Sequence, residues 1–127
     1  MAQNTKGLKI LFDHYQKLVL RADFLKAIDL YYADNINQFE NYQEPLVGKK
    51  LLRAKEEAVG QNISSMVAQI TNVVIDENQG IVWGRMKFVF ESVELGRKIL
   101  EEAFMQKWHK GKIIEQRFYY GGVKDQG

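Results

Sequence analysis

The chain of 127 residues contains no cysteine and a single proline. The lack of cysteine excludes disulfides, thiol nucleophiles and cysteine-ligated metals, and it is typical of proteins from a reducing compartment. The first residues, "MAQNTKGLKILF", contain no apolar run of signal-peptide length, and no later segment approaches the length of a membrane span. We therefore expect a cytoplasmic protein with no membrane partner.

An excess of one charge is also missing. The 18 basic and 16 acidic residues are spread along the chain and leave a net charge of +2. Nucleic-acid-binding domains usually concentrate basic residues in one patch, so we expect no nucleic-acid partner. Hydrophobic residues at 46% and charged residues at 27% are ordinary for a globular protein. At this length we expect one domain, residues 1–127.

The first half of the chain has helical periodicity. Residues 8–20 place apolar side chains three and four positions apart, and Asp23 is a suitable N-cap for a second helix that continues to Tyr31. "NINQFENYQEP" breaks this period and predicts a short strand followed by a turn at Pro45. A third helix is expected over residues 49–62.

The second half has the character of strands joined by short turns. "ISSMVAQITNVVI", "IVWGRMKFVFES", "RKILEEAFMQKW" and "IIEQRFYY" are connected through "DENQG", "VELG" and "HKGK". This pattern predicts a four-stranded antiparallel meander. Helices followed by strands indicate an α+β fold, with three N-terminal helices packed on one face of a curved antiparallel sheet.

The stretch "IVWGRMKFVFE" has two different faces, because side chains alternate across a strand. If the face with Arg85 and Lys87 is internal, the protein has a charged pocket; if the face with Met86 and Phe88 is internal, the basic residues are outside. Pairing across the three turns tests this choice. The expected pairs are Met66–Phe90, Ala68–Phe88, Ile70–Met86, Val74–Val82, Ile75–Ile81, Phe90–Ile99, Met86–Ala103, Gly84–Met105, Ala103–Phe118 and Met105–Gln116.

This register favours an apolar inner face, although a bulge in any strand would reverse the faces beyond it. On the reverse face, Lys87 is expected opposite Glu102, and Glu91 opposite Lys98, which are favourable cross-strand charge pairs. Aromatic side chains among those charges suggest a homodimer interface, the alternative being scattered exposed aromatics. The expected interface residues are Trp83, Arg85, Phe104, Trp108 and Tyr119.

The order of elements resembles the nuclear-transport-factor-2-like superfamily, also called SnoaL-like. Three helices, with "YYADNINQFE" as a strand before the third, precede a meander that ends in "WHKGKIIEQRFYYGG", and the resemblance covers nearly the whole chain. It implies a cone-shaped α+β barrel. The superfamily hosts isomerases, cyclases, dehydratases, hydrolases and non-catalytic binders, so the resemblance does not name a reaction.

Members that resemble ketosteroid isomerases use a tyrosine on the first helix and an acid on the first strand. By resemblance, these roles fall on Tyr15 as oxyanion donor and Glu40 as general base. Phe39 competes with Glu40 for the inner side of the short strand, so both orientations stay open. A second acid of the family, on the third long strand, aligns with Ala103 or with Phe104, so we expect no counterpart.

Two functions remain open. The first is a homodimeric small-molecule-binding protein, with or without cofactor-free acid–base catalysis by Glu40 and Tyr15, whose ligand is apolar or aromatic. The second is a non-catalytic dimeric module whose pocket is largely filled by its own side chains. The sequence shows no metal site, and no cofactor is expected. The expected pocket residues are Met86, Phe88, Phe90, Ala103, Met105, Gln116, Phe118 and Tyr120.

Overall fold

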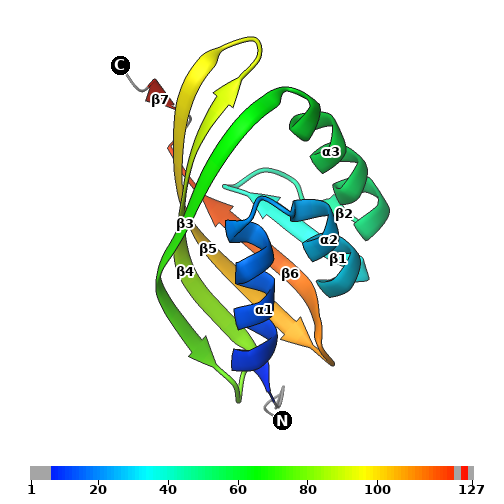
Figure 1. Ribbon diagram of the computed structural model, residues 1–127. Coiled ribbons are helices and arrows are strands. Elements are labelled where there is room, and N and C mark those ends of the chain that lie inside the picture. Colours follow the sequence, from blue (N-terminus) through cyan, green and yellow to red (C-terminus); the bar gives the residue numbers. More distant parts are fainter. Residues whose placement is uncertain (1–6, 122–123, 126–127) are drawn as a thin grey trace.

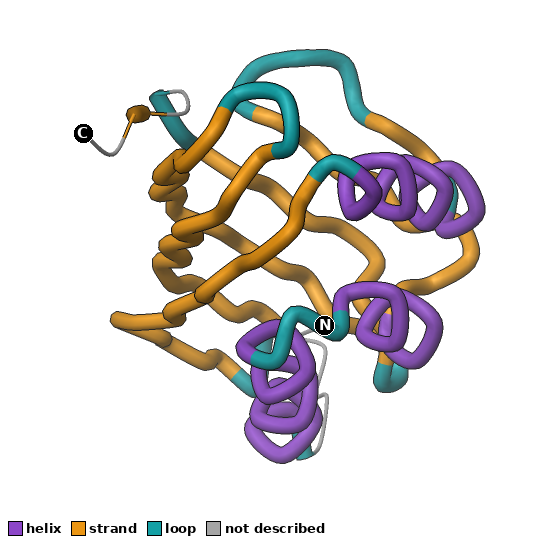
Figure 2. Tube along the Cα trace, turned by 45° about the horizontal axis from the view of Figure 1, so that its top comes forward, coloured by secondary structure: helices purple, strands orange, loops and turns teal. Residues whose placement is uncertain are grey.

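The computed structural model describes residues 7–121 and 124–125. Its elements follow the expected order. They are α1 (Leu8–Leu20), α2 (Phe24–Tyr31), β1 (Tyr32–Glu40), β2 (Leu46–Val47), α3 (Lys49–Gln61), β3 (Ile63–Asp76), β4 (Ile81–Ser92), β5 (Gly96–His109), β6 (Lys112–Tyr119) and β7 (Lys124–Asp125). The three helices lie on one side of a strongly curved sheet (Figures 1 and 2). The α+β class and the meander of β3 to β6 are therefore confirmed.

The curved sheet is open and mixed, which corrects the expectation that all of its strands are antiparallel. Its described strands follow the order β2-β1-β6-β5-β4-β3, with β7 paired to β5. β1 runs parallel to β6, a pairing that needs a long connection, and α3 and four strands separate these two elements in the chain. With β2 and β3 at opposite edges, the curved sheet forms a cone wall that the helices complete.

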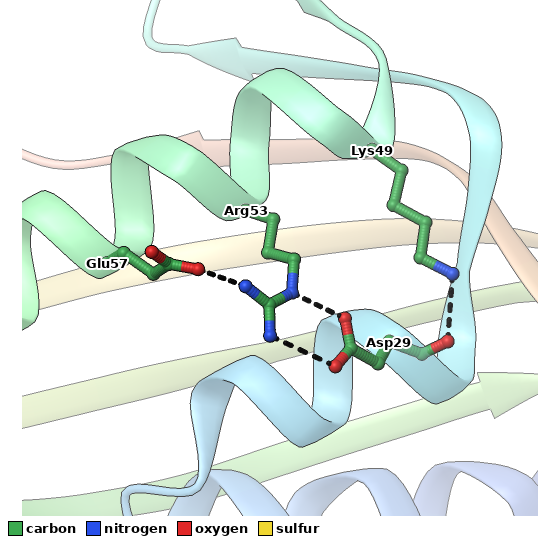
Figure 3. A network of polar contacts seen from close by, with 4 residues as sticks. All are labelled: Asp29, Lys49, Arg53 and Glu57. Atoms are coloured by element: carbon green, nitrogen blue, oxygen red, sulfur yellow. Dashed lines mark hydrogen bonds and ion pairs between the residues drawn. The ribbon is translucent and has the colours of Figure 1, made fainter.

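A salt-bridged contact joins α2 to α3 (Figure 3). The Arg53 guanidinium donates to both carboxylate oxygens of Asp29, at 2.7 and 3.3 Å, and also pairs with Glu57. The Lys49 ammonium donates to the Asp29 backbone carbonyl at 2.8 Å. Arg53 lowers the pKa of Asp29 through this hydrogen bond and its charge. These contacts hold the two helices side by side over the wide end of the sheet.

The register between β3 and β4 is as expected only in its first part. Met66–Phe90, Ala68–Phe88 and Ile70–Met86 are confirmed. A bulge between Thr71 and Val74 then shifts the pairing by one residue, so Val74 lies opposite Trp83, and Ile75 opposite Val82. Asn72 adopts a positive φ of 56° in this bulge, a conformation that Asn tolerates better than most residues. The expected Val74–Val82 and Ile75–Ile81 pairs are wrong.

The turn between β4 and β5 reverses the expected faces of β5. Ser92 pairs with Gly96 around a three-residue loop, with Gly96 at φ 81°, a geometry common in hairpins. The expected loop is one residue longer, so every expected pair along these strands is wrong by one position. Met86 lies opposite Glu102, and Gly84 opposite Phe104. The outer charge pairs are Lys87–Glu101 and Glu91–Arg97, in place of those expected with Glu102 and Lys98.

A bulge between Lys107 and Trp108 shifts the register with β6 as well. Phe118 consequently lies opposite Phe104 rather than Ala103, and Gln116 lies opposite Gln106 rather than Met105. Because this shift compensates for the one-residue difference in the β4–β5 turn, the side chains of β6 keep the faces that the sequence predicts. The faces that differ from the expectation are therefore those of β5 and of the end of β3 beyond its bulge.

Phe104 and Trp108 are core residues, which corrects their assignment to a dimer interface. Both are 0% exposed. The ring of Phe104 stacks on Phe12 with centroids 6.1 Å apart, and the ring of Trp108 meets Tyr15 edge-on at 6.1 Å. The inner face, defined by Met86 and Phe88 of β4 and Phe104 and Trp108 of β5, thus packs against α1.

Gly84 makes the close packing of Phe104 possible. A Cβ atom at this position would lie 2.7 Å from two carbons of the Phe104 ring, which is shorter than any van der Waals contact allows. The glycine in "IVWGRMKFVFE" is therefore required by the approach of the neighbouring strand's side chain.

Candidate functional site

A cavity of about 340 Å³ lies between the helices and the inner face of the sheet. Its apolar wall combines Phe24 and Ile28 of α2 with Met86, Phe88 and Phe90 of β4. Five of its polar lining residues come from four other elements: Tyr15, Tyr32, Glu40, Glu56 and Glu102. Binding pockets for small molecules have this composition, with a largely apolar wall and a few convergent polar groups.

The expected pocket residues divide into three groups. Met86, Phe88, Phe90, Phe118 and Tyr120 line the cavity. Gln116 is fully buried and lies behind the cavity wall. Its amide donates at 2.7 Å to the hydroxyl of Tyr32, which lines the cavity. Ala103 and Met105 lie on the outer face, with Ala103 exposed and Met105 opposite Trp83, so their expected placement in the pocket is wrong. The one-residue difference in the β4–β5 turn is the reason.

The remaining residues expected at a dimer interface lie outside the core. Trp83 is 48% exposed, and the Arg85 side chain, 63% exposed, pairs with Glu101 at 3.6 Å. Tyr119 is half-buried. Trp83 and Arg85 occupy the outer face of the sheet.

Glu40 points into the cavity, and its neighbour Phe39 points out. The Phe39 ring instead stacks beneath the Arg117 guanidinium, 3.9 Å from its carbon to the ring centroid. The Glu40 carboxylate pairs with the Lys55 ammonium at 3.7 Å and accepts a hydrogen bond from the Gln38 amide at 3.4 Å. Burial and a hydrogen bond donated to Glu40 raise the pKa of Tyr120 to about 12. Three donor groups thus surround the Glu40 carboxylate: the Lys55 ammonium, the Gln38 amide and the Tyr120 hydroxyl.

Glu102 is the acid that the sequence analysis missed. It lines the cavity from β5, where it faces Met86 across the strand pair. Burial raises the pKa of Glu102 to about 8, and the negative charges of Glu40 and Glu56 add to this effect. At neutral pH Glu102 is therefore mostly protonated, in the same cavity as Glu40. The signal that was available is Gly96, because a glycine at the end of "VELG" favours the shorter three-residue loop.

The helix α3 contributes two charged residues that were also missed. Lys55 and Glu56 both line the cavity from this helix. Burial raises the pKa of Glu56, Lys55 acts in the opposite direction, and Glu40 raises it further. The charged side chains of a surface helix usually face solvent, so nothing in the helical pattern singled out these two.

The hydroxyl groups of Tyr15 and Tyr32 are both buried at the cavity. Tyr15 is 4% exposed and Tyr32 is 8% exposed. Burial raises the pKa of Tyr15, and a hydrogen bond with the Gln106 side chain acts in the opposite direction. Burial likewise raises the pKa of Tyr32, against a hydrogen bond with Gln116. Both tyrosines consequently stay protonated and able to donate.

In the described part of the chain, no group of three His, Cys, Asp or Glu side chains is arranged to hold a metal ion. Nor does any described helix have the length and apolar character needed to cross a membrane.

No protein-family model matches the sequence, and no curated protein matches it. Solved structures do. A candidate SnoaL-like polyketide cyclase from Mesorhizobium loti is 24% identical, with 88% of this chain and 97% of that chain covered at a TM-score of 0.74. A protein of unknown function from Burkholderia pseudomallei, described as nuclear-transport-factor-2-like, is 10% identical, with 92% of each chain covered at 0.75. PrhC from Penicillium brasilianum is 13% identical, with 91% and 81% covered at 0.74.

This chain has the nuclear-transport-factor-2-like fold. Since the identities are below 25%, the similarity supports the fold that the sequence resemblance implies, not a reaction. Within this fold, the expectation that the third long strand offers no second acid is wrong. Glu102 precedes the aligned Ala103 by one residue and faces the cavity, because the strand's inner side is the one that carries Leu100, Glu102 and Phe104.

Proposed function

We propose that this protein binds an apolar, aromatic small molecule in the cavity and catalyses a cofactor-free proton transfer on it. The observation that carries the proposal is the pair of carboxyl groups in one cavity with different surroundings. Glu40 is ion-paired with Lys55, whereas burial and neighbouring charge raise the pKa of Glu102 to about 8. Two acids placed in different environments within one cavity are the usual arrangement for a base and an acid.

The chemistry follows from these positions. The Glu40 carboxylate removes a proton from a carbon beside a carbonyl group, and the electron pair moves onto the carbonyl oxygen. Tyr15 donates a hydrogen bond to the developing enolate oxygen, and protonated Glu102 is available to return a proton at a second position. Isomerisations and ring closures both use these steps, which suits a fold that also occurs in candidate polyketide cyclases.

The cavity volume argues against the second reading, a binding module with a self-filled pocket. That reading predicts a space too small for a ligand, whereas pockets that bind small molecules begin at roughly 300 Å³. At about 340 Å³, the cavity is large enough for a two-ring aromatic compound.

Hydrogen–deuterium exchange at the methyl group of 2-acetylnaphthalene tests the proposal without a known substrate. In D₂O, nuclear magnetic resonance should show that the protein accelerates exchange. Glu40→Gln should reduce the catalysed rate by about a hundredfold or more, as expected for the loss of a general base. Glu101→Gln, a glutamate on the outer face next to Glu102, should leave the rate unchanged. Binding without catalysed exchange, or exchange that survives Glu40→Gln, would reject the catalytic assignment.

We also propose that the protein is a homodimer formed through the outer face of the sheet. Exposed apolar side chains gather there: Val67 is 64% exposed, Val74 is 63% exposed and Trp83 is 48% exposed. Val74 lies directly opposite Trp83, and Val67 lies opposite Val89 further along the same two strands. Clustered aromatic and aliphatic residues on an otherwise charged sheet face are typical of an interface core.

A further inference from the structure

A chain of buried amide side chains runs beneath the cavity. The Trp108 indole N–H donates to Gln106 Oε1 at 3.1 Å, and Gln106 Nε2 donates to Gln116 Oε1 at 2.8 Å. Gln116 Nε2 then donates twice, to the Tyr32 hydroxyl oxygen at 2.7 Å and to Gln38 Oε1 at 3.1 Å. Gln106 and Gln116 are both 0% exposed, so these bonds are sheltered from water.

The groups at the two ends of this hydrogen-bonded series determine which atom donates and which accepts in each of its bonds. An indole nitrogen can only donate, so Gln106 must present its oxygen to Trp108 and its NH₂ group to Gln116. At the far end, Gln38 Nε2 donates to the Glu40 carboxylate at 3.4 Å, and a carboxylate only accepts. Each amide between these ends is therefore oriented without ambiguity, and both hydrogens of the Gln116 amide are used.

The direction of the chain decides the role of Tyr32. Its hydroxyl oxygen accepts a hydrogen bond from Gln116, so its own hydrogen must be donated elsewhere. Among the described residues, no side chain or backbone carbonyl accepts it. Because Tyr32 lines the cavity and is 8% exposed, the acceptor has to come from the cavity side. A buried donor left without an acceptor costs free energy, which a ligand oxygen would recover.

Tyr15 likewise has a hydrogen bond with a glutamine side chain, that of Gln106. The hydrogen bond from the Gln106 side chain lowers the pKa of Tyr15 against the effect of burial, which identifies the amide as donor and the phenol oxygen as acceptor. Tyr15 is 4% exposed and lines the same cavity as Tyr32. Two buried hydroxyl groups thus present hydrogens rather than lone pairs to that cavity.

We propose that Tyr32 is a second hydrogen-bond donor to the ligand beside Tyr15, positioned by Gln116 and Gln106, and that the cavity selects aromatic ketones. This inference rests on the proposed function and names its substrate class. A ketone oxygen accepts two hydrogen bonds and donates none, so it satisfies both hydroxyl groups together. An alcohol or amine nitrogen bound at the same point would bring hydrogens that compete with those of the tyrosines.

A matched pair of probes tests the donor role. 2-Acetylnaphthalene and 2-ethylnaphthalene have nearly the same shape and differ in the carbonyl oxygen. Tyr32→Phe should weaken binding of the ketone by about fivefold, as expected for one lost hydrogen bond, and leave binding of the hydrocarbon within about twofold. The infrared carbonyl band of the bound ketone should move to higher frequency in the variant, because a hydrogen bond to the oxygen weakens the C=O bond.

Gln116→Met tests the positioning role, since methionine has a similar volume and no hydrogen-bonding amide. If Gln116 acts through Tyr32, this change should reduce the preference for the ketone over the hydrocarbon. It should have no further effect on that preference when Tyr32→Phe is already present. A merely structural role would instead weaken both probes equally, in both backgrounds, and would overturn the positioning assignment.

The outcomes separate this inference from the proposed function. If Tyr32→Phe leaves both the ketone preference and the carbonyl band unchanged while exchange at the methyl group continues, Tyr32 is not a donor and the proposed function stands. If neither probe binds the wild-type protein, the proposed function and this inference both fail.

Discussion

Replacing Glu102 with glutamine should make the free energy of unfolding less sensitive to rising pH. Burial, aided by the charges of Glu40 and Glu56, raises the pKa of Glu102 from 4.5 to about 8 in the folded protein. Between these values the folded protein keeps the proton and the unfolded chain releases it, so the free energy of unfolding falls as the pH rises. The Glu102 contribution is fully present below pH 4.5 and is lost as the pH rises through about 8.

The size of the effect follows from the same two values. One pKa unit corresponds to about 1.4 kcal/mol, so the Glu102 contribution should fall by on the order of 3 kcal/mol between pH 5 and pH 8. Glutamine cannot ionise and has nearly the same shape. The difference in free energy of unfolding, variant minus wild type, should therefore increase by that amount over the same range. Glu56, whose pKa is also raised, contributes to both proteins and cancels in the difference.

Urea unfolding followed by tryptophan fluorescence, at several pH values from 5 to 9, measures this difference. Glu101→Gln is the matched control, because Glu101 is the next residue on β5 and its side chain is 55% exposed beside Arg85. The control difference should stay within about 0.5 kcal/mol across the range. A Glu102→Gln difference that does not change with pH, or one that Glu101→Gln reproduces, would refute the reasoning.

Two further predictions concern packing and assembly. Gly84→Ala should lower the free energy of unfolding by about 1–3 kcal/mol in urea titrations, because the new methyl group would overlap the Phe104 ring. Gly60→Ala should be neutral or stabilising, because a Cβ atom at position 60 would have nothing within 4 Å. Equal effects of the two alanines would contradict the close approach of Phe104. In sedimentation at micromolar concentration the wild-type protein should be a dimer, and the Trp83→Ser variant should be a monomer. The control Leu95→Ser, which changes an exposed side chain at a hairpin tip, should remain dimeric. A monomeric wild-type protein would contradict the proposed interface.

Much of the fold could be predicted from periodicity. The apolar stripe from Leu8 to Val19 identified α1 and placed Tyr15 on its buried side, as the structure confirms. The alternation in "IVWGRMKFVFE", combined with its expected pairing to the neighbouring strands, put Met86, Phe88 and Phe90 at the cavity and Arg85 outside. These predictions succeeded because each segment has one face that is clearly more apolar than the other.

The strand β5 offered no such contrast. One of its faces carries Leu100, Glu102, Phe104 and Trp108, and the other carries Ile99, Glu101, Ala103 and Met105, so each mixes acids with apolar residues. Its orientation had to be inferred from the turn before it, and an error of one residue there exchanged the two faces. That error removed Glu102 from the site and placed Phe104 and Trp108 at the surface.

The sequence by itself therefore determined the element order and the helix faces, which depend on periods contained within each segment. It also determined the inner face of β4, which the expected pairing with β3 identified. Only the tertiary structure decided which acids share the cavity. Glu40, Glu56 and Glu102 lie on three elements that meet through the parallel pairing of β1 with β6, a bulge, and the loop that ends at Gly96. The reason is geometric: a strand repeats every two residues, so one residue gained or lost in a turn or bulge exchanges its faces, and local periodicity carries no record of that count.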